Sequence, residues 1–198
     1  MNDDERALLL RTYGEEYGPD AGPWNTSVKS KYLEHAIARF FEENFTVGSG
    51  FDVCNVGIGA GGRDRYLSYR LNGGRLTSID VDGDCCRLLE LRLINEKNPN
   101  AVTVIHADLL TVSGMENRFD LVTMVGSTRQ ESGSYEPILT KAMRLVKPGG
   151  SFYYQTLDKR EETGPFLKLC EKNGLTVSNC QLDAAYGFRA QYFKAVRP

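Results

Sequence analysis

The sequence of 198 residues is poor in several features that mark particular classes of protein. Its five cysteines are odd in number and include no Cys-x-x-Cys pair, which argues against a disulfide framework or a zinc site. No apolar run approaches the roughly 20 residues of a membrane span, and the acidic start lacks the apolar region of a secretion signal. The 24 basic and 26 acidic residues nearly balance, so no net charge attracts nucleic acid or an anionic membrane. We therefore expect a cytoplasmic protein, a monomer or homodimer, with neither of these partners.

From residue 51 onward, short apolar runs alternate with single helical stretches. These strand-like runs lie at residues 51–56, 76–79, 102–105, 119–125 and 151–155. Because such crossovers are right-handed and join parallel strands, the pattern predicts a doubly wound α/β sheet covered on both faces. Two further runs, 175–182 and 191–196, have no helix between them and predict an antiparallel hairpin. A doubly wound sheet binds its ligand beyond the carboxyl ends of its strands.

Residues 1–45 precede this alternation and differ from it in composition. Through about Asn25 the chain mixes acidic, aromatic and Gly-Pro turn residues, which predicts a short helix followed by a turn-rich arm. Apolar side chains from Val28 to Phe41 then recur at helical spacing, which predicts a helix that Thr26 or Ser27 can cap. We therefore divide the chain into an N-terminal helical arm, residues 1–45, and a ligand-binding domain, residues 46–198.

The strongest local motif is a glycine-rich turn, Asn55–Gly62, between a predicted strand and a predicted helix. Gly57 permits a tight turn, and Gly59 and Gly61 let the backbone approach a ligand without a Cβ in the way. Free N–H groups and the helix dipole favour an anionic group nearby. The same residues also satisfy Gly-x-Gly-x-x-Gly, a pattern that fits a dinucleotide or another adenosine-bearing cofactor.

Two aspartates lie in register with this turn. Asp80 ends the second predicted strand, roughly twenty residues past the glycines, where a carboxylate can accept hydrogen bonds from both ribose hydroxyl groups. Asp108 follows the third strand and can accept a hydrogen bond from an adenine amino group. Residues 147–150, Lys-Pro-Gly-Gly, predict a sharp turn from helix to strand. Each aspartate alone could be a helix cap or a solvated charge, but together with the turn they indicate an adenosine cofactor.

The order of these features resembles that of class I S-adenosylmethionine-dependent methyltransferases over residues 51–198. The resemblance implies a Rossmann-like seven-stranded sheet of order 3-2-1-4-5-7-6, with strand 7 antiparallel, and S-adenosylmethionine as cofactor. Asn55 stands where the family commonly has an acidic residue. A nicotinamide oxidoreductase is the rival, but the chain has no second domain and no Tyr-x-x-x-Lys pair.

The resemblance also implies a set of cofactor-binding residues. Asp80 matches the ribose-binding acid, Val81 the apolar residue beside the adenine, and Asp108 with Leu109 the position at the adenine edge. The full set that we expect to bind the cofactor is Asn55, Gly57, Ile58, Gly59, Gly61, Asp80, Val81, Asp108, Leu109, Val125 and Trp24.

Methyl transfer from a sulfonium needs alignment of the acceptor more than it needs particular side chains. The segment after the fourth strand, Met124–Arg129, lacks the Asn/Asp-Pro-Pro-Tyr box of amino methyltransferases, and no Pro-Cys nucleophile or paired metal-binding acids are recognisable. We therefore expect metal-independent, in-line transfer to O or N of a small molecule. The alternative is a methyltransferase, or a non-catalytic cofactor-binding module, that acts with a partner on tRNA or protein.

Substrate-side residues are less clearly marked, and the sequence identifies no general base. By resemblance to small-molecule members of the family, residues 1–45 are expected to form a lid over the cleft, with Tyr13, Tyr17 and Trp24 as wall residues. Arg129 could pair with an anionic acceptor, and Arg189 could reach the mouth of the cleft. The alternatives are that these aromatics pack the arm onto the core and that the arginines are surface residues.

Overall fold

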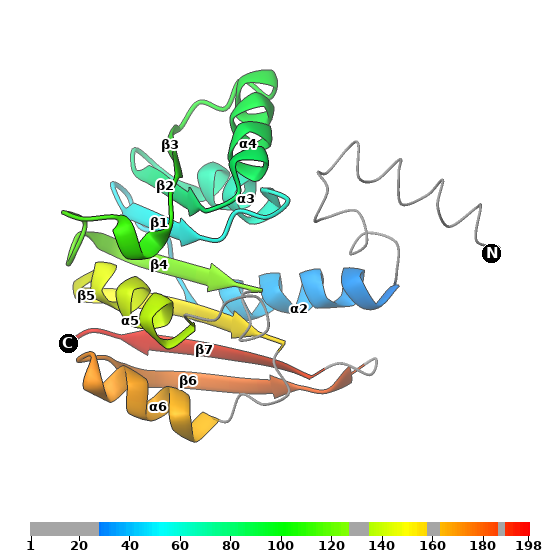
Figure 1. The fold of residues 1–198 in the computed structure, drawn as a ribbon. Helices are drawn as coiled ribbons and strands as arrows, with labels where there is room; N and C mark the ends of the chain where they lie inside the picture. The colour runs from blue at the N-terminus through cyan, green and yellow to red at the C-terminus, as the bar shows by residue number, and fades with distance from the viewer. Residues whose placement is uncertain (1–27, 127–134, 158–162, 186–188) are drawn as a thin grey trace.

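The computed structural model describes residues 28–126, 135–157, 163–185 and 189–198 (Figure 1). Its strands are β1 (Asp52–Val56), β2 (Arg75–Asp80), β3 (Ala101–His106), β4 (Phe119–Val125), β5 (Val146–Thr156), β6 (Thr176–Asp183) and β7 (Ala190–Val196). Its helices are α2 (Val28–Asn44), α3 (Gly62–Arg70), α4 (Gly83–Asn95), α5 (Tyr135–Leu145) and α6 (Thr163–Lys172), with a 3-10 turn η2 (Leu109–Thr111).

The strands form one seven-stranded sheet in the order β3-β2-β1-β4-β5-β7-β6. The pairs from β3 through β5 are parallel, whereas β7 runs antiparallel to both β5 and β6. The predicted Rossmann-like order and the antiparallel hairpin are therefore confirmed. Because the central strands are parallel, the loops that follow β1, β2 and β4 meet at one edge of the sheet.

One strand boundary differs from the sequence expectation. The structure starts β5 at Val146, whereas the apolar pattern placed its beginning at Ser151. Val146 pairs with Phe119 and Ser151 pairs with Leu121, so β5 advances five residues while β4 advances two. The predicted turn at residues 147–150 is thus an irregularity inside the strand, because Val146 is already paired with β4 before the turn begins.

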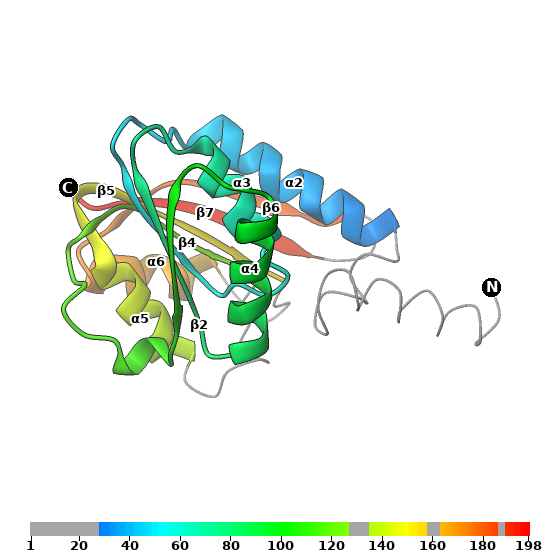
Figure 2. The same cartoon turned by 90° about the horizontal axis from the view of Figure 1, so that it is seen from above.

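Helices cover both faces of the sheet, α2 and α3 on one and α5 and α6 on the other (Figure 2). Phe40 of α2 is 1% exposed and stacks on Tyr153 of β5 and Tyr192 of β7, with ring centroids 5.6 and 5.4 Å apart. α2 therefore belongs to the hydrophobic core around the central strands. The division of the chain at residue 45 and the lid stay predictions, because residues 1–27 lie outside the described residues.

The cysteines and the helices can be compared with what the sequence predicts for disulfides and membrane spans. The cysteines are all free, and only Cys180 is exposed. Among the residues that the structure describes, no helix combines the length and apolar character needed to cross a lipid bilayer.

Replacing Phe40 with alanine should lower the free energy of unfolding by about 3–5 kcal/mol, because it leaves a cavity between α2 and two buried tyrosine rings. Urea unfolding measures the change. Leu91→Ala is the control, since Leu91 is 54% exposed and its loss should stay within about 0.5 kcal/mol. A loss below about 1 kcal/mol for Phe40→Ala would contradict the core position of α2.

Candidate cofactor site

The glycine turn connects the carboxyl end of β1 to α3. Gly57, Gly59 and Gly61 adopt positive φ values of 85°, 50° and 71°, a region that other residues enter at a cost. Gly61 is the residue that precedes the first turn of α3. The turn thus needs glycine at these three positions for its backbone path alone.

Gly59 and Gly61 differ in what lies beside them. A Cβ added at Gly59 would meet no atom of the described residues within 4 Å, so among these residues the turn presents open backbone there, as a closely approaching ligand requires. A Cβ at Gly61 would lie 3.2 Å from Leu89 Cδ1 of α4, which shows that this glycine admits close helix packing. The open face at Gly59 fits an adenosyl cofactor lying against the backbone. Ligand contact at Gly61 stays a prediction.

Asp80 holds the glycine turn from the end of β2. Its Oδ2 accepts hydrogen bonds from the N–H groups of Ile58 at 2.6 Å and Gly59 at 3.2 Å, and its Oδ1 accepts from Asp82 N–H at 2.9 Å. A carboxylate has about four lone-pair sites, so Oδ1 keeps capacity for a further donor such as a ribose hydroxyl. Asp80 therefore makes a structural contact to the turn, and its binding of the ribose stays a prediction.

Asn55 lies beneath the turn and is 1% exposed. Its Nδ2 donates to the carbonyl oxygen of Gly57 at 3.0 Å and to Asp64 Oδ1 at 2.9 Å, and its Oδ1 accepts from Thr123 Oγ1 at 2.6 Å. Its amide thus ties β1, β4 and α3 together within the protein. The expected contact of Asn55 with the cofactor stays a prediction, and the structure gives it a role in positioning the turn.

Asp64, in the first turn of α3, is a buried acid that the sequence argument did not single out. Burial raises the pKa of Asp64 to about 6, opposed by the neighbouring Ser78 and Asn55 side chains. In the sequence, the only sign of this residue was an acidic side chain about one helical turn after the glycines. Nothing in the sequence shows that this position faces the interior.

Arg63 is a second residue that sequence reasoning missed. Its guanidinium lies over the rings of Phe41, Tyr66 and Tyr153, 5.5 to 5.7 Å from each centroid. Burial lowers the pKa of Arg63, and three aromatic faces stabilise the cation. Arg63 therefore anchors the start of α3 against α2 and β5.

The remaining predicted cofactor residues differ in exposure. Val81 is 70% exposed, as a side chain beside a ligand would be, whereas Ile58 is 4% exposed and packs with α4. Asp108 Oδ1 accepts from Leu110 N–H at 2.9 Å, and Leu109 is 5% exposed. Val125 is half-buried at the end of β4.

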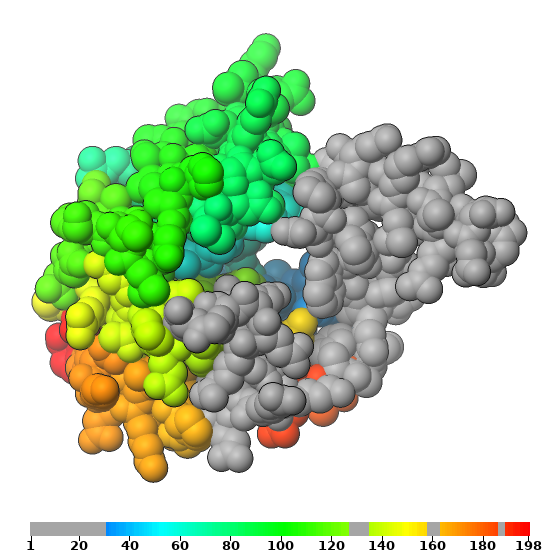
Figure 3. Space-filling model, in the orientation of Figure 1, coloured from blue at the N-terminus to red at the C-terminus, as the bar shows by residue number. Residues whose placement is uncertain are grey.

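Most of the residues that we predict on the substrate side lie outside the described part of the chain. Tyr13, Tyr17, Trp24 and Arg129 lie outside the described residues, and Arg189 is exposed directly before β7. Part of α2, in blue, is visible near the middle of the space-filling view (Figure 3). Because β1 and β4 are parallel neighbours, the glycine turn and the end of β4 lie at the same edge of the sheet.

Stability should depend on pH through Asp64. Because its pKa is raised to about 6, the folded chain holds one proton more than the unfolded chain between about pH 4 and 6. The free energy of unfolding should therefore fall as pH rises through this window, by up to about 1.4 kcal/mol per unit. Asp64→Asn, which keeps an acceptor for Asn55, should lack this slope. Urea unfolding of both proteins from pH 4.5 to 7 tests this, and parallel curves would refute it.

Comparison with known proteins identifies a family. A family model described as a methyltransferase domain matches residues 53–150. Release factor glutamine methyltransferase of Chlorobaculum tepidum is 27% identical over 137 residues, which cover 63% of this chain and 45% of that protein. The chain thus spans less than half the length of this curated relative.

Solved structures share the fold at low identity. The 1,6-didemethyltoxoflavin-N1-methyltransferase of Burkholderia thailandensis, with bound S-adenosylhomocysteine, is 17% identical with a TM-score of 0.69, covering 100% of this chain and 91% of that one. Magnesium protoporphyrin IX methyltransferase of Synechocystis PCC 6803, also with this compound, is 12% identical with a TM-score of 0.71, covering 99% and 100%. The family match over residues 53–150, together with this shared fold and the geometry of the turn, indicates a class I S-adenosylmethionine-dependent methyltransferase domain with S-adenosylmethionine as its cofactor.

Proposed function

We propose that this enzyme transfers the methyl group to an oxygen or nitrogen atom of a small molecule, by in-line displacement without a metal. The observation that carries this proposal is the end of β4, where Met124, Val125 and Gly126 continue into a segment without an Asn/Asp-Pro-Pro-Tyr box. That box is typical of amino methyltransferases that act on bases or glutamine. Its absence favours an acceptor held by other means.

The chain's own residues would bind and orient the cofactor. The Asp80 carboxylate would accept from the ribose, the open backbone at Gly59 would allow close approach, and Asp108 with Leu109 would meet the adenine. The cofactor supplies an electrophilic methyl group on a positively charged sulfur, so the protein's task is alignment and exclusion of water. A lid formed by the part of the arm that precedes α2, with Tyr13 and Tyr17, would serve the second task.

The names of the structural neighbours support a small acceptor. One acts on 1,6-didemethyltoxoflavin and another on magnesium protoporphyrin IX. The release factor relative favours the alternative, a protein or tRNA acceptor presented by a partner, but the alignment covers only 45% of its length. On the substrate side, Arg129 and Arg189 are proposed to pair with an anionic group of the acceptor.

Incubation with cell extract and S-adenosylmethionine labelled in its methyl group separates these candidates. We expect label in the low-molecular-weight fraction and none above background in RNA or protein. A reaction without the enzyme provides the blank, and the Asp80→Asn variant should transfer less label because it binds the cofactor more weakly. Label found only in RNA or protein would reject the small-molecule proposal.

Asp80→Asn should weaken binding of S-adenosylhomocysteine by about 1–3 kcal/mol, because a neutral amide loses the charge-assisted hydrogen bonds and places an N–H₂ group against a backbone donor. Calorimetry measures the loss, and thermal unfolding verifies that the variant is folded. Asp82→Asn is the matched control. Asp82 caps α4 by accepting from Asp84 and Cys85 N–H groups, and asparagine caps about equally well. Unchanged affinity in folded Asp80→Asn would remove Asp80 from the site.

A further inference from the structure

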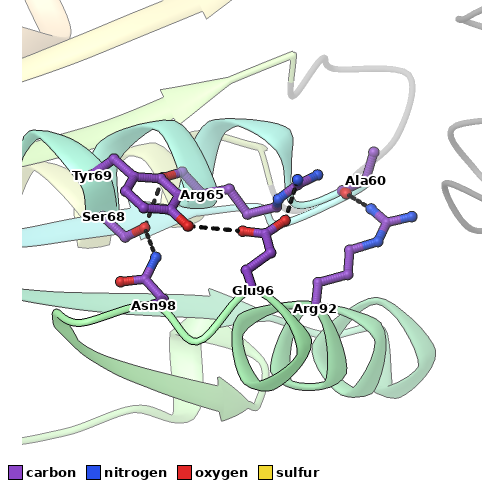
Figure 4. Close-up of polar contacts among 7 residues, drawn as sticks. All are labelled: Ala60, Arg65, Ser68, Tyr69, Arg92, Glu96 and Asn98. Atoms are coloured by element: carbon purple, nitrogen blue, oxygen red, sulfur yellow. Dashed lines mark hydrogen bonds and ion pairs between the residues drawn. The ribbon is translucent and has the colours of Figure 1, made fainter.

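The glycine turn is also held from outside the strands, by Arg92 in the last turn of α4. Arg92 Nη1 donates to the carbonyl oxygen of Ala60 at 2.6 Å (Figure 4). Ala60 lies between Gly59 and Gly61, which both have positive φ. The peptide unit that carries this carbonyl also carries the Gly61 N–H, which donates to the Ile58 carbonyl at 2.9 Å. Because a peptide unit is planar, orienting one of these groups orients the other.

The residues directly after α4 make other polar contacts with α3, and these do not reach the turn. Glu96 forms an ion pair with Arg65 and accepts a hydrogen bond from the Tyr69 hydroxyl at 3.5 Å. Asn98 Nδ2 donates to Ser68 Oγ at 2.7 Å. These contacts join the end of α4 to the flank of α3 (Figure 4). Substitutions at these contacts can therefore serve as controls for a substitution at Arg92, which contacts the turn itself.

We propose that Arg92 is a positioning residue for the glycine turn and so for the cofactor that binds there. Glycines on both sides of Ala60 tolerate either sign of φ, so the peptide units between them can rotate at little cost unless something holds them. A charged donor on the carbonyl supplies that restraint with a strong hydrogen bond. Asp80 holds the N–H groups at the start of the turn, and Arg92 holds the carbonyl farther along. The turn is thereby preorganised before the cofactor arrives, which lowers the entropic cost of binding.

The ordinary role of an arginine at this place is a favourable interaction with the negative end of the helix dipole. That role stabilises α4 and predicts no effect on the turn. The two roles therefore differ in what a substitution changes. The positioning role depends on cofactor binding by the turn, as the proposed function does, but not on the identity of the methyl acceptor.

Two measurements on Arg92→Met test the proposal. Calorimetry should show S-adenosylhomocysteine binding about tenfold weaker than to the wild-type chain. Hydrogen exchange in the ligand-free protein, followed by mass spectrometry, should be faster in the peptide covering residues 56–62. Arg92→Lys keeps the positive charge at the end of α4 but loses the planar guanidinium group. Its affinity for S-adenosylhomocysteine should therefore lie between those of the wild type and Arg92→Met. Arg92→Lys also keeps the test decisive if Arg92→Met does not fold.

Glu96→Gln is the matched control, because it breaks the ion pair with Arg65 of α3 and leaves the contact between Arg92 and Ala60 in place. Its affinity for S-adenosylhomocysteine and its exchange in residues 56–62 should match the wild type. Equal effects of the Arg92 and Glu96 substitutions, or weaker binding without faster exchange, would overturn the positioning role. Wild-type binding of S-adenosylhomocysteine tests the cofactor site separately, and the labelled-methyl assay tests the acceptor class.

Discussion

The site depends on one carboxylate that joins the ends of two neighbouring strands. β1 and β2 are parallel and in register, with Val56 opposite Ile79, so the turn after β1 lies beside the last residue of β2. That residue is Asp80, whose Oδ2 accepts from both Ile58 and Gly59. A charged acceptor between two backbone donors gives the turn a defined shape. The register of the sheet therefore determines the shape of the cofactor turn.

Beneath this contact, a buried polar cluster connects the same turn to the rest of the sheet. Asn55 uses its amide to contact Gly57, Asp64 and Thr123, which come from the turn, α3 and β4. Buried polar groups are costly when unpaired, so such a cluster holds its members in a specific arrangement. Burial raises the pKa of Asp64 in this cluster to about 6, because it disfavours the charged carboxylate. The opening of α3 is thus held by polar contacts as well as by apolar packing.

Much of the fold could be predicted because its signals are local. Alternating strands and single helices indicate parallel pairing, and the hairpin without a helix indicates the reversed β7. The glycines and Asp80 could be located because a βα turn and a strand end are recognisable in the sequence. The contacts of Asp64 and Arg92 could not, since each depends on which face of a helix meets a distant segment. The start of β5 could not be located, because Val146 pairs with Phe119 before a turn that looks in the sequence like the start of the strand.

By itself the sequence determined the alternation of strands and helices, the glycine turn and the acid beside it, since apolar periodicity and glycine placement act over a few residues. The strand order was implied by the resemblance to a known family. The tertiary structure alone decided how that turn is held. Arg92 meets Ala60 across 32 residues of chain, and Thr123 meets Asn55 across 68. Such contacts exist only after the strands have paired and the helices have packed, because hydrogen bonds require their groups within about 3 Å of each other.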